Sequence, residues 1–105
     1  MVTDTTGKIQ SVNAAFTELT GYEAKEVVGM TPSLLKSGKQ DRGFYDAMWD
    51  QIRSQSFWQG EIWNRKKNGD IYLEWLTISA VKNDAGDVVY YSGMFSDITK
   101  QRGFK

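Results

Sequence analysis

Two polar side chains interrupt apolar runs between residues 61 and 81. Asn64 directly follows Trp63, and Glu74 directly precedes Trp75. An amide both donates and accepts hydrogen bonds, whereas a carboxylate only accepts them until it is protonated. A buried polar group without a partner costs about 1–3 kcal/mol. We therefore expect these two residues either to bond each other or nearby backbone groups, or to bind a ligand held inside the protein.

The residues needed for most catalytic and metal chemistry are missing. The chain has no cysteine and no histidine, which excludes disulfides, thiolate metal sites and cysteine nucleophiles and removes the usual haem ligand. Glu61, Glu74 and Asp97 show no spacing typical of paired catalytic carboxylates, and no phosphate-binding glycine loop is present. We predict no catalytic residue, no metal site and a protein that is not an enzyme.

Composition and charge limit the partners further. A chain of 105 residues that is 40% hydrophobic and 13% aromatic predicts one domain, residues 1–105, with a real core. Thirteen basic residues balance thirteen acidic ones, which argues against nucleic acid or anionic lipid as a partner. No signal peptide or bilayer-spanning run is found. We expect a cytoplasmic domain without membrane contact.

The first half of the chain predicts short elements. Two short strands surround a turn at residues 5–7. Asn13 and Gly21 are typical of the start and end of a helix, and a further helical turn ends at Gly29. Residues 31–41 are interpreted as a loop.

Asp41 then caps a longer helix over residues 42–55, whose apolar stripe includes Met48 and Trp49. Three long strands follow, predicted at residues 60–67, 71–82 and 87–98. The order of elements indicates an α+β fold with one antiparallel sheet and helices on one side.

The second turn, at residues 83–86, predicts a register in which Glu74 lies opposite Phe95, and it gathers Glu74, Leu76 and Ile78 on one inner face. The first turn leaves two alternatives. A two-residue turn at Asn68-Gly69 places Asn64 opposite Leu73. A three-residue loop over residues 68–70 places it opposite Glu74.

The opposite face of these strands is too apolar to be left in water. Its members are Trp63, Leu73, Trp75, Tyr90 and Met94. We expect a homodimer through this face, or a helix from outside the chain to cover it.

The chain resembles a PAS domain across essentially its whole length. The resemblance is carried by an ordered set rather than by one residue. The set comprises "TDTTGKIQSVNAAFTELTGYEAKEVVGM" at 3–30, "LLKSGKQDRGFYDAMW" at 34–49 and "FWQGEIWNRKKNGDIYLEWLTISAVKNDAGDVVYYSGMFSDIT" at 57–99.

This resemblance implies the PAS fold: a five-stranded antiparallel sheet with short helices on one face and a ligand cavity between them. It also implies a sensory or dimerising fragment of a larger bacterial signalling protein, linked to an output domain such as a histidine kinase or a cyclic-dinucleotide cyclase. Asp97, Ile98 and Thr99, at the end of the last strand, would then carry the signal output.

The resemblance also bears on the ligand. Photoactive flavin PAS domains of the light-oxygen-voltage type use a cysteine adduct, which this chain cannot form. Of the polar positions that hold their flavin ring, Asn64 is retained, Glu74 replaces Asn and Phe95 replaces Gln. The segment "FWQGEIWNRKK" is similar to redox-flavin PAS domains of the nitrogen-fixation sensor and aerotaxis receptor type. FAD or FMN is therefore the candidate cofactor.

A small ligand would lie between the inner sheet face and the long helix. The expected ligand-binding residues are Asn64, Glu74, Trp58, Phe95, Leu76, Ile78, Met48 and Trp49. The alternatives stay open at each of them: Asn64 and Glu74 would form a structural pair, Trp58 would anchor the helix to the sheet, and Met48 and Trp49 would fill the core. The whole domain would then be a ligand-free dimerisation module.

Overall fold

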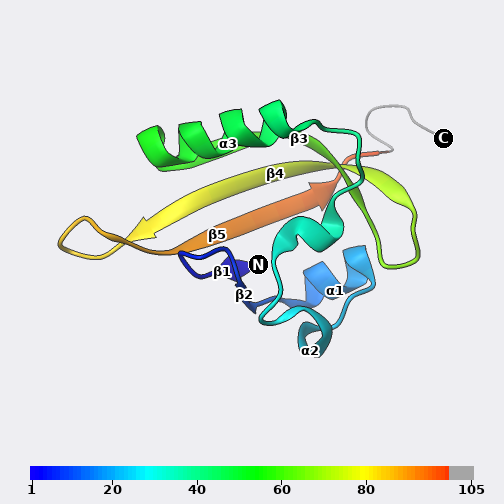
Figure 1. Cartoon of the computed structure of the whole chain (residues 1–105). Helices are drawn as coiled ribbons and strands as arrows, with labels where there is room; N and C mark the ends of the chain where they lie inside the picture. Colours follow the sequence, from blue (N-terminus) through cyan, green and yellow to red (C-terminus); the bar gives the residue numbers. More distant parts are fainter. Residues whose placement is uncertain (100–105) are drawn as a thin grey trace.

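The computed structural model describes residues 1–99 (Figure 1). Its elements follow in the order β1 (Val2–Thr3), β2 (Ile9–Ser11), α1 (Ala14–Thr20), α2 (Ala24–Val27), the 3₁₀-helix η1 (Pro32–Leu35), α3 (Arg42–Gln55), β3 (Phe57–Arg65), β4 (Ile71–Lys82) and β5 (Val88–Asp97). The α+β prediction, with helices between two groups of strands, is confirmed.

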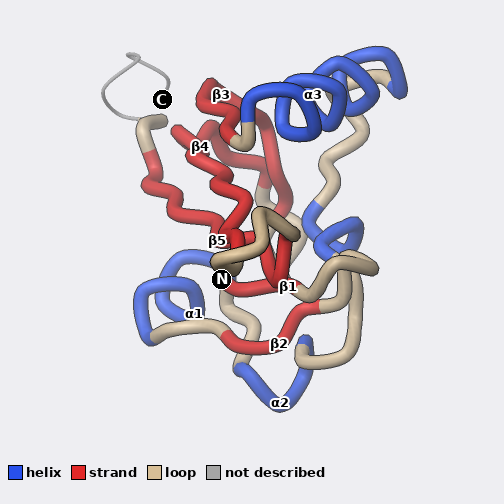
Figure 2. The backbone as a smooth tube through the Cα atoms, turned by 90° about the vertical axis from the view of Figure 1, so that its left-hand side faces the viewer, coloured by secondary structure: helices blue, strands red, loops and turns tan. Residues whose placement is uncertain are grey.

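All five strands belong to one antiparallel sheet with the order β2-β1-β5-β4-β3. The β3–β4 and β4–β5 hairpins pair strands that are neighbours in sequence, whereas β1 pairs with the distant β5. The start of the chain therefore lies beside the last strand, at the centre of the sheet (Figures 1 and 2).

The helix ends agree with the sequence prediction because the capping chemistry is local. Asn13 and Asp41 begin α1 and α3, and each side chain accepts a hydrogen bond of 2.9 Å from a backbone N–H three residues later. Gly21 ends α1 with a φ of 82°, in the left-handed region that only glycine enters without strain.

Strand β3 ends at Arg65 rather than residue 67, and β5 spans Val88–Asp97 rather than residues 87–98. Two further differences from the prediction have a clear local cause. The predicted loop contains η1, a turn that Pro32 begins because a proline fits the first position of a helix. Strand β3 begins at Phe57, three positions earlier than residue 60. Ser56 takes a left-handed conformation with a φ of 66° and reverses the chain directly from α3 into the strand.

The predicted β4–β5 register is wrong by two residues. Glu74 lies opposite Asp97, and Phe95 lies opposite Leu76. One residue of the shift comes from the turn, where the Asn83 N–H donates to the Asp87 carbonyl at 2.9 Å and leaves a loop of three residues, 84–86, instead of four. The other comes from an irregularity between Val81 and Lys82. A shift of two leaves every side chain on its predicted face, because the strand period is also two.

The β3–β4 loop fits neither alternative. The Lys66 N–H donates to the Asp70 carbonyl at 2.8 Å, which leaves a three-residue loop over residues 67–69, one position earlier than predicted. Asn64 therefore lies opposite Tyr72. Both polar residues, Asn64 and Glu74, still share the inner face, the face on which the helices pack.

Two apolar clusters lie on that inner face. One joins the short N-terminal elements and is built on Ile9, Phe16, Val27 and Leu35. The other joins α3 to the sheet and is built on Met48, Ile52, Ile62 and Leu76. Phe95 packs against both, so the centre of β5 connects the two halves of the core.

Candidate functional site

A cavity of about 770 Å³ lies between the inner sheet face and the helices. This is within the range of about 300–1,000 Å³ typical of small-molecule sites. Its lining includes seven of the eight residues predicted to bind a ligand: Asn64, Glu74, Phe95, Leu76, Ile78, Met48 and Trp49. Most of the wall is apolar, and the sheet contributes the polar groups of Asn64 and Glu74 at one end.

That polar end is a buried hydrogen-bonded cluster of three residues. The Tyr72 hydroxyl donates to Glu74 Oε1 at 2.6 Å, and the Asn64 amide hydrogen-bonds to the same carboxylate. Tyr72, Asn64 and Glu74 are 3%, 7% and 1% exposed. The predicted polar pair is thus completed by a tyrosine from the same strand as Glu74, two residues earlier, which the sequence analysis did not single out.

Burial decides the charge state of this cluster. Removing Glu74 from water raises its pKa to about 7, against hydrogen bonds from Tyr72 and Asn64 that favour the ionised form, and the nearby Asp97 carboxylate raises the pKa further. Burial and the negative Glu74 also raise the pKa of Tyr72 well above its usual value. Tyr72 therefore stays a hydroxyl donor, and Glu74 is the group that titrates near neutral pH.

The structure does not bring Trp58 to the cavity. Trp58 lies on the inner face between β3 and α3, where its ring meets Phe44 edge-to-face at 5.8 Å. The ring also folds over Gly60, at which a Cβ would lie 2.9 Å from the indole. Trp58 thus takes the alternative role of anchoring the helix, and Gly60 is required because any side chain there would displace the indole.

The segment before α3 forms one wall of the cavity. Gln40 ties it to β3, because its Nε2 donates to the Trp63 carbonyl at 2.8 Å and its Oε1 accepts from the Trp63 N–H at 2.7 Å. Lys36 and Arg42, both exposed, also line the cavity. The Lys36 ammonium lies 4.4 Å from the centre of the Tyr45 ring. Lys36 therefore supplies positive charge where the cavity meets solvent, whereas Arg42 is paired there with Asp46 at 3.9 Å.

The lining fits a planar ligand with an apolar body, one hydrogen-bonding edge and a negatively charged tail. A flavin has these properties, so the residues present fit it. Asn64 and Glu74 would face the edge of the ring, Phe95 and Leu76 its body, and Arg42 a phosphate. The site differs from the light-oxygen-voltage arrangement at both substituted positions: Glu74 carries a titratable group and Phe95 an apolar ring in place of an amide.

The outer face of the sheet is partly exposed. Trp75 is 39% exposed, Tyr90 38% and Met94 73%. Trp63 is half-buried, with the Lys39 ammonium 5.6 Å from its ring centre. Leu73 is 4% exposed, so the chain already covers it and it offers almost no surface to a partner.

The end of β5 is fastened beside the polar cluster. The Ile98 N–H donates to the Leu73 carbonyl at 3.0 Å, and the Leu73 N–H donates to Thr99 Oγ1 at 3.1 Å. Asp97, directly opposite Glu74, accepts from the Thr99 N–H at 2.9 Å. The three residues predicted to carry the output therefore connect to β4 one position away from Glu74.

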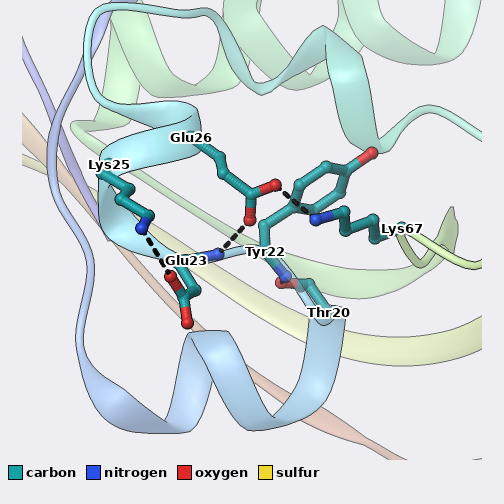
Figure 3. Close-up of polar contacts among 6 residues, drawn as sticks. All are labelled: Thr20, Tyr22, Glu23, Lys25, Glu26 and Lys67. Carbon is teal, nitrogen blue, oxygen red and sulfur yellow. Dashed lines mark hydrogen bonds and ion pairs between the residues drawn. The ribbon is translucent and has the colours of Figure 1, made fainter.

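A second polar cluster, shown in Figure 3, lies on the surface and was missed by the sequence analysis. The Lys67 ammonium donates to Glu26 Oε1 in a short ion pair, and the Lys67 N–H donates to the Thr20 carbonyl at 2.8 Å. The Glu26 side chain also accepts from the Glu23 N–H at 2.8 Å. These contacts fasten the β3–β4 loop to α1 and α2.

Within residues 1–99 neither a metal site nor a membrane-spanning helix is present. No group of acidic side chains there is arranged to hold a metal ion. None of the helices in that range is both long enough and apolar enough to cross a bilayer.

Comparison with known proteins gives a consistent picture. A family model described as PAS domain matches residues 1–100. The nitrogen fixation regulatory protein of Klebsiella oxytoca is 32% identical over 98 residues, which cover 93% of this chain and 20% of that protein. Phototropin-1A of Oryza sativa subsp. japonica is 32% identical over 92 residues, covering 88% of this chain and 10% of that protein. The chain thus spans a fifth or less of these relatives.

Solved structures agree with the fold. An RNA-binding light-oxygen-voltage receptor superposes with a TM-score of 0.88 at 30% identity, covering 96% of this chain and 29% of that one. A PAS domain from Colwellia psychrerythraea gives a TM-score of 0.87 at 25% identity, covering 94% of this chain and 84% of that one. The five-stranded sheet with helices on one face is shared with both.

Proposed function

Because the chain belongs to the PAS domain family, we propose that it is the sensory module of a larger cytoplasmic signalling protein. It binds a small ligand between sheet and helices and passes a change in that ligand to a covalently linked output domain. The relatives support this role, since they include a nitrogen fixation regulatory protein and a blue-light-activated histidine kinase. The chain itself supplies binding and regulation rather than catalysis.

The observation that carries the proposal is the cavity of about 770 Å³ with its polar end. A ligand-free module would fill this space with side chains, because protein interiors are packed to the density of organic crystals. Here the apolar wall formed by Met48, Leu76 and Ile78 encloses space instead of closing on itself, and two polar groups face into it.

A flavin, FAD or FMN, is the ligand proposed. It would supply redox or light-absorbing chemistry when bound, without a cysteine adduct. Asn64 and Glu74 would orient the ring edge, Phe95 would exclude water from one face, and Lys36 and Arg42 would attract the phosphate.

Reconstitution tests this proposal. The purified chain is incubated with FMN or FAD, and bound flavin is measured by absorption and by quenching of flavin fluorescence. Ile78→Trp, on the inner face, fills the cavity and should abolish binding. Ser79→Trp, the next residue on the outer face, adds the same ring outside the cavity and should leave binding unchanged.

A native chain that binds neither flavin would contradict the flavin assignment. Equal binding by the Ile78→Trp and Ser79→Trp variants would contradict the cavity as its site.

Signal output would pass through the end of β5. Glu74 faces the cavity and lies opposite Asp97, while Ile98 and Thr99 are hydrogen-bonded to the backbone of Leu73. A change in the ligand that moves or recharges Glu74 would alter how this end of the strand is held. Only a ligand that interacts differently with the two arrangements can shift their populations.

A second role, self-association through the outer face, is favoured by the exposure of Trp75, Tyr90 and Met94. All three lie on the outer face of β4 and β5, with Met94 opposite Thr77 near Trp75 and Tyr90 opposite Val81 nearer the turn. Trp75→Glu places a charge within that surface and should convert a homodimer into a monomer in analytical ultracentrifugation. Unchanged self-association of this variant would exclude the outer face as the interface.

A further inference from the structure

At the polar end of the cavity, Tyr72 and Asn64 both hydrogen-bond to Glu74. The Tyr72 hydroxyl donates to Glu74, and the Asn64 hydrogen bond favours the ionised carboxylate, so the amide N–H points at Glu74 as well. The Glu74 carboxyl accepts these bonds, so an ionised Glu74 presents only acceptor oxygens to a ligand.

The surroundings of Glu74 favour its neutral form. Its side chain is 1% exposed, and within residues 1–99 no lysine or arginine forms an ion pair with it. The group opposite, on β5, is another carboxylate, Asp97. Two negative charges on adjacent strands repel, and burial of an unpaired charge is costly.

The charged side chains on the helical side of the cavity do not neutralise an ionised Glu74. Arg42 and Asp46 of α3 line the cavity. Arg42 Nε lies 3.9 Å from Asp46 Oδ2, so the charges of these two side chains compensate each other. Lys36 lies over the ring of Tyr45. The groups that shift the pKa of Glu74 are Tyr72 on its own strand, Asn64 on β3 and Asp97 on β5. Two further titratable groups line the cavity, Tyr91 of β5 and the N-terminal ammonium of Met1, whose pKa burial lowers, and neither is among them.

We propose that Glu74 couples ligand binding to the uptake of one proton. The cavity binds a planar ligand with carbonyl oxygens along one edge while Glu74 is protonated and donates its O–H to one of those oxygens. This inference rests on the proposed function, because it concerns the same cavity, and it names the class of ligand edge that the cavity accepts.

Repulsion between acceptors is the physical reason. An ionised Glu74 would place a carboxylate oxygen against a ligand carbonyl, with no proton between them. Protonation replaces this contact with a hydrogen bond in a site sheltered from water, where such bonds are strong. The proton comes from solvent, and no bond other than the carboxyl O–H is made.

The proton is available under ordinary conditions, because burial raises the pKa of Glu74 to about 7. A ligand that requires the protonated form binds with full affinity below that pH and loses about tenfold in affinity for each pH unit above it. Between pH 6 and pH 8 the expected loss is therefore about tenfold.

Riboflavin is a suitable probe, because it carries the carbonyl edge of the flavins but no phosphate that would titrate in the same range. Its Kd is measured at pH 6 and pH 8 for three proteins. The native chain should bind about tenfold more weakly at pH 8. Glu74→Gln, whose amide donates at any pH, should bind equally at both. Glu18→Gln, the same change on the exposed side of α1, should behave like the native chain.

A second measurement needs no variant. Titration calorimetry of the native chain at pH 7, in buffers with different enthalpies of ionisation, should report uptake of about half a proton per riboflavin, since half of Glu74 is then already protonated.

The outcomes separate the two proposals. An unchanged Kd between pH 6 and pH 8 with no proton uptake, or a Glu74→Gln variant that keeps the tenfold change, contradicts the proton coupling alone. A native chain and a Glu74→Gln variant that both fail to bind riboflavin at either pH contradict the coupling and the flavin site together.

Discussion

Glu26 and Glu74 both accept hydrogen bonds, yet their environments shift their pKa values in opposite directions. Glu26 lies on the surface, where the Glu23 N–H and the Lys67 ammonium hold its pKa below the usual value. Glu74 lies inside, where burial raises its pKa to about 7 despite two donors. Hydrogen bonds alone do not fix the charge of a carboxylate, because desolvation outweighs them when no cation is present.

The two carboxylates therefore differ in what a change of pH does to them. The Glu26–Lys67 pair keeps one charge state across the physiological range and joins α2 to the β3–β4 loop (Figure 3). Glu74 changes charge within that range, and it does so at the wall of the cavity and next to the end of β5. The following predictions test this contrast, beginning with the largest effect.

Glu74→Gln should change how stability depends on pH. The pKa of Glu74 is about 7 in the folded chain and about 4.3 when unfolded. Because the folded value is the higher one, the native chain is favoured at low pH and loses stability as pH rises through the two values. The full loss is about 3–4 kcal/mol between pH 4 and pH 8.

Urea unfolding at both pH values measures this. Glu74→Gln removes the contribution, so the variant should gain stability relative to the native chain as the pH rises. Glu18→Gln serves as the control and should follow the native profile. A native chain and a Glu74→Gln variant with parallel profiles would show that Glu74 titrates normally.

Tyr72→Phe should have an intermediate effect. It removes the hydroxyl that donates to Glu74 at 2.6 Å, and a buried hydrogen bond to a charged group contributes about 2 kcal/mol. The loss should be larger at pH 8, where Glu74 is ionised, than at pH 5, where it is protonated. Equal losses at the two pH values would mean that the hydroxyl does not stabilise the ionised form.

Lys67→Met should have the smallest effect. The ion pair with Glu26 is exposed to water and ions, and exposed pairs contribute little. The decrease in Tm should be smaller than that for Tyr72→Phe and should disappear at high salt, because salt screens surface charges. A decrease that persists at high salt would show that the ammonium does more than pair with a surface carboxylate.

Much of the fold could be predicted from short-range signals. Asn13 and Asp41 predict where their helices begin, because capping involves residues only three positions apart. The inner and outer faces of β4 and β5 follow from alternation alone. The β4–β5 register was predicted incorrectly for two reasons. The loop has one residue fewer than predicted, and the irregularity at Val81 and Lys82 depends on how the two strands twist together rather than on a turn motif.

The candidate site could be predicted in part. The polar interruptions at Asn64 and Glu74 marked the end of the cavity, because a buried polar residue needs a partner. The role of Tyr72 was not predicted, since a tyrosine on a strand fits an apolar core equally well. Gln40 was missed for another reason: its bonds to the Trp63 backbone cross 23 positions of sequence, and no local pattern encodes them.

The charge state of Glu74 is the centre of this account, and it can be observed directly. A carbon-detected NMR titration of the glutamate side-chain carboxyls in the native chain follows each group separately. We expect one carboxyl, absent from the spectrum of Glu74→Gln, to titrate with a midpoint near pH 7, and the Glu26 carboxyl to titrate below the usual value for a glutamate. If the Glu74 carboxyl titrates together with that of Glu26, the proton-coupled cavity described here is wrong.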